Sequence, residues 1–97
     1  MRVSWTEQAL GQLDEAIAFI AADRPEVALD WLERLLEAGE SLAELSDRGR
    51  VVPEAGRKEV RELLVGPYRL VYRRDTDAVT ITMVLHGRRE LHADNVP

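Results

Sequence analysis

The spacing of apolar residues changes along this chain, from steps of three and four to steps of two. Between Thr6 and Leu45 the apolar residues recur at the spacing of one face of an α-helix. From Lys58 to His86 the spacing shifts toward alternation with polar residues, which is the pattern of a half-buried β-strand. The alternation is less regular over Lys58–Val65, so the face of Arg61 stays open. Because the helical segments come first and the strands follow as a run, the sequence predicts an α+β fold.

Two amphipathic helices are predicted in the first half. The Thr6 hydroxyl can cap the first helix, which we expect to run to about Ala22. Asp23 is expected to cap the second helix, which we expect to continue to about Leu45. Pro25 stands in its first turn, where the missing backbone N–H of proline is tolerated. A short turn between them predicts an antiparallel helical hairpin. The apolar stripes are Leu10, Leu13, Ile17 and Ile20, followed by Ala28, Leu32, Leu35, Gly39 and Leu42.

A small antiparallel sheet is predicted in the second half, after a loop over 46–56. The helical hairpin is expected to pack on the sheet face that carries Tyr68, Leu70 and Tyr72 together with Ile81, Met83 and Leu85. The opposite face would then present Arg69, Arg73 and His86, with Arg88 and Arg89 just beyond Gly87. The expected strands are Lys58–Val65, Tyr68–Arg73 and Val79–His86, with a short edge strand at Arg2–Trp5.

Length and composition set further bounds. A chain of 97 residues predicts a single domain spanning residues 1–97. The chain has no cysteine, and its two histidines have no neighbouring ligand partner, so we expect neither a metal site nor a cofactor. Nothing approaches a membrane-spanning run, so a cytoplasmic location is expected. A net charge of −5 disfavours non-specific coating of DNA. Direct sequence-specific DNA binding by this chain alone is not expected either.

Charge is distributed unevenly. Residues 1–47 contain eleven acidic and three basic side chains, whereas residues 48–89 contain ten basic and five acidic ones. Arginines gathered on one sheet face suit the recognition of phosphate or carboxylate groups, because guanidinium groups bind either bidentately. The alternative is that these arginines pair with Glu59, Glu62 and the helical acids. His86 could act as a general acid or base, or have no chemical role.

The chain resembles the ParE branch of the ParE/RelE toxin superfamily along nearly its whole length. The ordered set of matching residues carries the resemblance, rather than any one of them. The first part of the set is Trp5, Ala9, Leu13, Ile17, Ile20, Pro25 and Ala28. The second part is Gly49, Arg50 and Pro53, then 60–63, 68–73 and 84–89.

This resemblance implies a toxin of a type II toxin–antitoxin pair, with a hetero-oligomeric complex and a cognate ParD-like antitoxin as partner. ParE-like members inhibit DNA gyrase by binding it, and they are associated with plasmid maintenance and stress response. RelE-like members are metal-independent endoribonucleases that cut messenger RNA in the ribosome. A third class is an inactive or regulatory member that only binds its antitoxin.

The residues that RelE-like members use are only partly present. Arg69 and Arg89 match two catalytic arginines of that branch, but no lysine stands at 60–62. No tyrosine follows Tyr72, and the approximate position of the branch's tyrosine is Asn95. The resemblance therefore favours a gyrase-binding toxin without catalytic residues. If the chain is a nuclease, the resemblance implies Glu62, Arg69, His86 and Arg89 as its catalytic residues.

Two sets of binding residues are predicted. The target-binding set draws on the basic sheet face and its extension, and the antitoxin-binding set adds apolar residues of the second helix. The target-binding set is Arg61, Arg69, Arg73, His86, Arg88 and Arg89. The antitoxin-binding set is Trp31, Leu35, Arg69 and Arg73.

Overall fold

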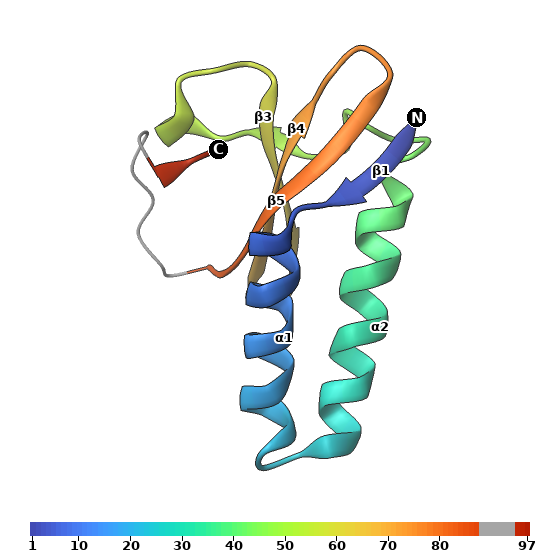
Figure 1. The fold of residues 1–97 in the computed structure, drawn as a ribbon, viewed down its shortest axis with the longest axis vertical. Coiled ribbons are helices and arrows are strands. Elements are labelled where there is room, and N and C mark those ends of the chain that lie inside the picture. The colour runs from blue at the N-terminus through green and yellow to red at the C-terminus, as the bar shows by residue number, and fades with distance from the viewer. Residues whose placement is uncertain (88–94) are drawn as a thin grey trace.

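A computed structural model describes residues 1–87 and 95–97 of the chain (Figure 1). The helical hairpin lies against a curved sheet, and the chain runs from strand to helices and back to strands. The strands are β1 (Arg2–Trp5), β2 (Arg50–Val51), β3 (Val60–Val65), β4 (Tyr68–Arg74) and β5 (Ala78–His86). The helices are α1 (Glu7–Ala21), α2 (Pro25–Ser41) and the short 3-10 helix η1 (Pro53–Ala55).

The five strands form one sheet in the order β1-β5-β4-β3-β2. β3, β4 and β5 pair antiparallel, as predicted, and β2, which lies in the predicted loop, pairs antiparallel with β3. β1 instead pairs parallel with β5, in register from Arg2 opposite Ala78 to Trp5 opposite Ile81. A parallel pair requires a long crossover connection, and here the helical hairpin and three strands supply it. The predicted α+β fold with a helical hairpin is confirmed, and the sheet is mixed.

The helix starts follow local chemistry. Thr6 caps α1 as predicted, because its Oγ1 accepts a hydrogen bond from the Ala9 N–H at 3.1 Å. The prediction that Asp23 caps α2 is wrong, since Arg24 is the N-cap residue and its side chain makes no cap hydrogen bond. Pro25 disfavours a helical conformation in the residue before it, which holds Arg24 outside the helix. The second helix ends at Ser41, earlier than Leu45.

A β-bulge in β5 changes which side chains face the helices. Val71 pairs with Met83 and Tyr72 pairs with Ile81, which leaves Thr82 as an additional residue on β5. An extra residue in one strand moves the side chains beyond it to the opposite face. The prediction that Met83 and Leu85 face the helices is therefore wrong.

Apolar side chains cover both faces of the sheet. The helix-side cluster joins the hairpin to the sheet, and the second cluster, on the outer face, joins β3, β4 and β5 to the segment that contains η1. β4 contributes to both clusters, so its first five residues are all buried. The helix-side cluster includes Ala9, Leu13, Leu35, Leu42, Leu70, Tyr72, Ile81 and Val84. The outer cluster is Val52, Ala55, Val60, Val71, Met83, Leu85 and Val96.

The loop after α2 is held to the sheet by a buried tyrosine. The Tyr72 hydroxyl donates to the Ser46 carbonyl at 2.8 Å and accepts from the Gly49 N–H at 3.0 Å. Burial raises the pKa of Tyr72 above its ordinary value, so the hydroxyl stays protonated and can donate. The Gly49 carbonyl in turn accepts from Arg61 Nη1 at 2.9 Å.

Replacing Gly49 by Ala is expected to lower the free energy of unfolding by about 1–3 kcal/mol, the usual cost of overpacking. A Cβ at this position would lie 2.5 Å from the Glu62 carbonyl oxygen and 2.7 Å from the Tyr72 hydroxyl. Thermal unfolding measures the effect, at roughly 4–8 °C per kcal/mol for a domain of this size. Gly11→Ala is the matched control, because its Cβ meets nothing within 4 Å. Equal melting temperatures for both variants would contradict the prediction.

Candidate functional site

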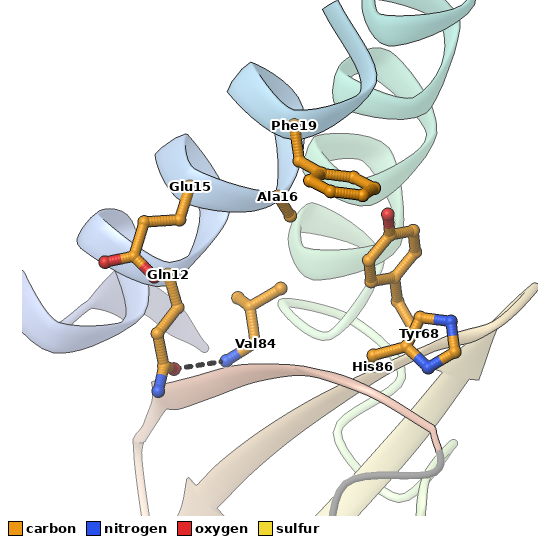
Figure 2. Close-up of a pocket in the computed structure, with 7 residues that line it drawn as sticks. All are labelled: Gln12, Glu15, Ala16, Phe19, Tyr68, Val84 and His86. Atoms are coloured by element: carbon orange, nitrogen blue, oxygen red, sulfur yellow. Dashed lines mark hydrogen bonds between the residues drawn. The ribbon is translucent and has the colours of Figure 1, made fainter. Parts of the chain in front are cut away.

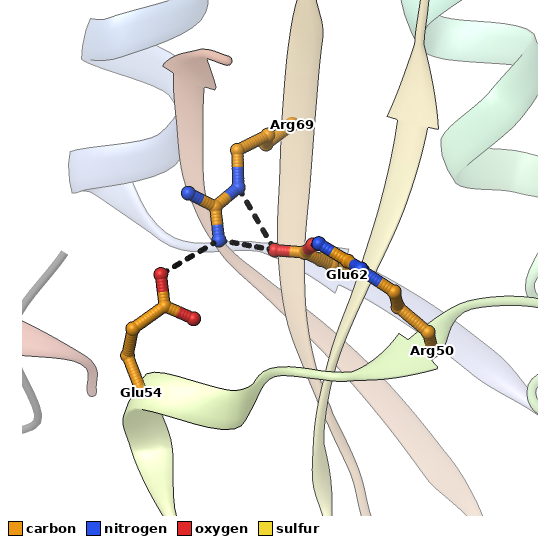
Figure 3. A network of polar contacts seen from close by, with 4 residues as sticks. All are labelled: Arg50, Glu54, Glu62 and Arg69. Atoms are coloured by element: carbon orange, nitrogen blue, oxygen red, sulfur yellow. Dashed lines mark hydrogen bonds and ion pairs between the residues drawn. The ribbon is translucent and has the colours of Figure 1, made fainter. Parts of the chain in front are cut away.

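Two places carry the predicted functional side chains, and the first is a buried ion cluster on the outer face of the sheet. Figure 3 shows Glu62 between Arg69 and Arg50, with Glu54 on the far side of Arg69. Arg69 Nε donates to Glu62 Oε2 at 2.8 Å, and Arg69 Nη2 contacts the same oxygen. The other oxygen, Glu62 Oε1, accepts from Arg50 Nε at 2.7 Å. Glu54 Oε2 lies 3.5 Å from Arg69 Nη2.

Strand register assembles this cluster. β2 places Arg50 directly opposite Glu62, and β3 pairs Leu64 with Arg69, so all three side chains share a face. Glu62 is 1% exposed and Arg69 is 7% exposed. A carboxylate buried this deeply requires cationic partners, and it has one arginine on each oxygen. The Arg69 guanidinium is therefore engaged by carboxylates of its own chain.

The other predicted arginines also contact acidic side chains. Arg61 pairs with Tyr72 across the strands, so it lies on the helix side of the sheet, opposite to Arg69. Arg73 Nε lies 3.3 Å from Asp75 Oδ2. The acidic partners of the predicted arginines come from turns and strands rather than from the acidic face of α2. Arg88 and Arg89, predicted to bind the target, lie outside the described residues.

The second place is a cavity of ≈ 310 Å³ beside His86. Figure 2 shows α1 on one side of it and the ends of β4 and β5 on the other. The His86 ring meets Tyr68 edge-on, with ring centroids 5.9 Å apart. Phe19 stands at the rim and is 84% exposed. The lining residues are Gln12, Glu15, Ala16, Phe19, Tyr68, Val84 and His86.

This cavity exists because β1 ends at Trp5 and does not accompany the last part of β5. The Val84 N–H, which would otherwise pair with a strand, donates to Gln12 Oε1 at 2.8 Å. The Gln12 side chain of α1 thus satisfies a backbone N–H at the edge of β5, and α1 lies over the open end of that strand (Figure 2). The site combines an apolar floor with an exposed imidazole and the Glu15 carboxylate at its margin.

Of the predicted nuclease residues, Glu62 and Arg69 contact each other, but His86 lies away from them; Arg89 lies outside the described residues. His86 pairs with Tyr68 on β4, and Arg69 is the next residue of that strand. Consecutive residues of a strand point to opposite faces, so His86 lies on the helix side while Arg69 and Glu62 lie on the outer side. The sequence predicted His86 on the same face as the arginines because regular alternation along β5 was assumed, without the bulge at Thr82.

The predicted antitoxin-binding residues of α2 occupy different environments. Leu35 is 0% exposed in the helix-side cluster. Trp31 is half-buried, with its ring edge-on to Tyr68 at 5.5 Å and Arg34 stacked on it at 4.3 Å. Arg50 and Glu54 of the ion cluster were not among the predicted site residues, although Arg50 is one of the residues that carry the family resemblance.

The described part of the chain has neither a candidate metal-binding cluster nor a helix that could span a membrane. Among residues 1–87 and 95–97, no group of three or more His, Cys, Asp or Glu side chains is placed to hold a metal ion. None of the helices in this same part of the chain is long and apolar enough to cross a membrane.

Comparison with known proteins agrees with the resemblance. The profile of the family described as "ParE toxin of type II toxin-antitoxin system, parDE" matches residues 3–91. The chain is 38% identical over 92 residues to Y4kP of Sinorhizobium fredii (strain NBRC 101917 / NGR234), which is named as a candidate toxin. That match covers 92% of this chain and 91% of Y4kP.

Two solved structures share the fold. A chain of the chromosomal ParDE toxin–antitoxin system from P. aeruginosa aligns with a TM-score of 0.75 at 22% identity, covering 89% of this chain and 95% of that one. A chain of the RelBE2 toxin–antitoxin complex from Mycobacterium tuberculosis aligns with a TM-score of 0.58 at 24% identity, covering 88% of each. Because the family profile matches nearly the whole length of this chain, the chain belongs to the ParE toxin family of type II toxin–antitoxin systems.

Proposed function

We propose that this toxin acts in the cytoplasm by binding DNA gyrase and inhibiting it, without catalysing a reaction itself, and that a ParD-like antitoxin neutralises it. Membership of the ParE family and the implied mode of action of that family support the proposal. The observation that carries it is the position of His86, on the opposite side of the sheet from Arg69 and Glu62.

Cleavage of RNA through the 2′-hydroxyl would require a base, a cation at the phosphate and a proton donor around one scissile bond. Acid–base groups must lie within hydrogen-bond reach of the atoms they serve. His86 and Arg69 project from opposite faces of the sheet, so one phosphate cannot contact both. Arg69 is also held by Glu62, and this pairing would have to break before the guanidinium could hold a phosphate bidentately.

Binding to a protein target does not require a base, a cation and a proton donor to lie around one bond. The described surface offers an exposed imidazole, an exposed Phe19 ring and a cavity between them, all near the open end of β5. An aromatic group beside a cavity is the kind of feature that anchors protein–protein contacts. We therefore assign the His86 cavity to target binding, together with the predicted Arg88 and Arg89.

His86→Gln is expected to retain most of the inhibition of gyrase supercoiling and most of the accumulation of cleaved DNA–gyrase complex. Glutamine can keep a hydrogen bond, and no proton transfer by this chain is required. Removal of a proton-transferring group from a nuclease would instead cost about 10²–10⁴ in rate. Purified gyrase and ribosome cleavage assays, run side by side on both proteins, make the measurement.

Phe19→Ala provides the comparison for this experiment, because it removes an exposed ring at the rim of the same cavity. It should weaken gyrase inhibition more than His86→Gln does, while leaving thermal stability nearly unchanged. The proposal fails if His86→Gln abolishes toxicity in a normally folded protein and the wild type cuts messenger RNA on ribosomes. Antitoxin binding without activity in either assay would indicate the regulatory class.

A further inference from the structure

The last part of β5 is an open sheet edge. β1 accompanies β5 only from Ala78 to Ile81, and the Thr6 N–H donates to the Ile81 carbonyl at 3.0 Å just before the chain enters α1. β5 continues to His86. Within residues 1–87 and 95–97, no strand therefore lies beside its last residues on the side where β1 ended.

The direction of the backbone groups along this edge follows from two hydrogen bonds. The Val84 N–H points away from β4, because it donates to Gln12 Oε1 on α1. The N–H and C=O of one strand residue point to the same side, and the side alternates from residue to residue. The Val84 carbonyl and both backbone groups of His86 therefore point to the open side. The Gly87 N–H agrees with this alternation, since it donates to the Pro67 carbonyl at the start of β4.

The cavity of ≈ 310 Å³ lies between this edge and α1 (Figure 2). Val84 and Ala16 supply apolar surface inside it, and Phe19 stands at the rim. The volume is at the lower end of the range for ligand pockets, which suits one or two side chains of a partner. A chain that pairs with the open edge would thus bury apolar surface at the same place, which is favourable.

The wall that α1 contributes is acidic. α1 contains Glu7, Asp14 and Glu15 and no basic residue. Of these three, Glu15 lines the cavity. A carboxylate in this position favours a partner that carries lysine or arginine and disfavours an acidic one.

We propose that the open end of β5 binds an extended segment of gyrase as an added strand, with an apolar side chain in the cavity and a lysine or arginine beside Glu15. One residue of a parallel segment can donate to the Val84 carbonyl and accept from the His86 N–H, which continues the parallel pairing of β1. Strand addition at an exposed edge is a recurrent mode of peptide recognition. The inference rests on the proposed inhibition of gyrase and names the part of the target that is recognised.

Hydrogen exchange of the chain, free and bound to intact gyrase, is the first measurement. The exchange of the His86 amide should slow by at least about tenfold in the complex, because this N–H gains a carbonyl partner. The amides of Leu85 and Gly87 point to the β4 side and should change much less. They serve as internal controls for a general stabilisation of the chain.

Two variants test the backbone and the cavity separately. His86→Pro removes the N–H, and proline is tolerated on an edge strand where the N–H faces outward. It should inhibit gyrase about tenfold more weakly than His86→Gln, which loses the same imidazole but keeps the N–H. Ala16→Leu fills the cavity from α1 and should also weaken inhibition, while thermal unfolding shows that it remains folded.

A charge variant tests the acidic wall. Glu15→Gln should bind gyrase about two- to fivefold more weakly, as for a partly exposed charge pair, and the difference should shrink with added salt. Glu33→Gln is the matched control and should leave the affinity unchanged. Glu33 is an exposed carboxylate in the middle of α2 and does not line the cavity.

The outcomes separate this inference from the proposed function. Equal inhibition by His86→Pro and His86→Gln, or an unprotected His86 amide in a complex that inhibits supercoiling, would overturn the inference and leave the function intact. Protection of this amide by the antitoxin or by a second copy of the chain, but not by gyrase, would overturn it as well. If His86→Pro does not fold, the exchange measurement and Ala16→Leu decide. If the wild type does not inhibit gyrase, the proposed function and the inference are both wrong.

Discussion

Glu62→Ala is expected to lower the free energy of unfolding by about 3–5 kcal/mol, the usual cost of removing one partner from a buried ion pair. Glu62 is 1% exposed and accepts from Arg50 and Arg69 on its two oxygens. Without this carboxylate, Arg69 keeps only Glu54 at 3.5 Å among the described residues. The substitution lowers stability because it leaves the buried Arg69 guanidinium with too little opposite charge nearby.

Chemical and thermal unfolding measure this effect, and the melting temperature should fall by more than about 10 °C. Glu54→Ala is the matched control, because the Glu54 side chain is 36% exposed and its contact with Arg69 is longer. That change should cost at most about 1 kcal/mol, as for a partly exposed ion pair.

A compensating variant tests the cause. Glu62→Leu combined with Arg69→Met replaces both charges by apolar groups, and such replacements of buried pairs are often neutral. The double variant should therefore recover most of the stability that Glu62→Ala loses. If Glu62→Ala and Glu54→Ala destabilise equally, or if the double variant is the least stable, the buried pair does not have the role assigned to it.

The structural role of Arg69 affects how functional data should be interpreted. Arg69→Ala would also break the buried pair, so a loss of toxicity in that variant could follow from misfolding. Arg73, whose contact with Asp75 is largely exposed, is the better variant for testing the predicted basic face. Its effect on antitoxin or gyrase binding can be measured in a protein whose core is unchanged.

The elements of this fold are largely readable from local sequence. Helical spacing of apolar residues predicted α1 and α2, and alternation predicted β3, β4 and β5, because both patterns depend only on neighbours along the chain. The Thr6 cap is equally local. The two-residue strand β2 lies in the predicted loop. It was not predicted, because a strand of two residues that pairs Arg50 with Glu62 is too short to show a periodic pattern in the sequence.

The arrangement of the candidate sites could not be predicted in the same way. A single additional residue at Thr82 reverses the faces of β5 beyond it. The alternation from Val79 to His86 fails only in the apolar run Met83-Val84-Leu85, which does not by itself indicate a bulge. The partners of Arg69 depend on the register of three strands, which local spacing does not determine. The predicted set of Arg69, Arg73 and His86 on one face therefore separates into two faces.

Leu35→Ala is expected to lower the free energy of unfolding by about 2–5 kcal/mol, the usual cost of truncating a buried leucine to alanine. Leu35 is 0% exposed and belongs to the cluster between the hairpin and the sheet. The cavity left by the lost atoms lies between α2 and the sheet, where rigid neighbours limit collapse. Its position thus favours a packing role over the predicted contact with the antitoxin.

Leu36→Ala is the matched control, since the next residue of α2 is 40% exposed. Urea unfolding of both variants, with and without saturating antitoxin, separates packing from binding. A partner that binds only the folded state adds the same stabilisation to wild type and Leu35→Ala if Leu35 makes no contact with it. If Leu35→Ala unfolds at the wild-type urea concentration but gains less from the antitoxin, then Leu35 reaches the partner directly, and α2 must reposition when the complex forms.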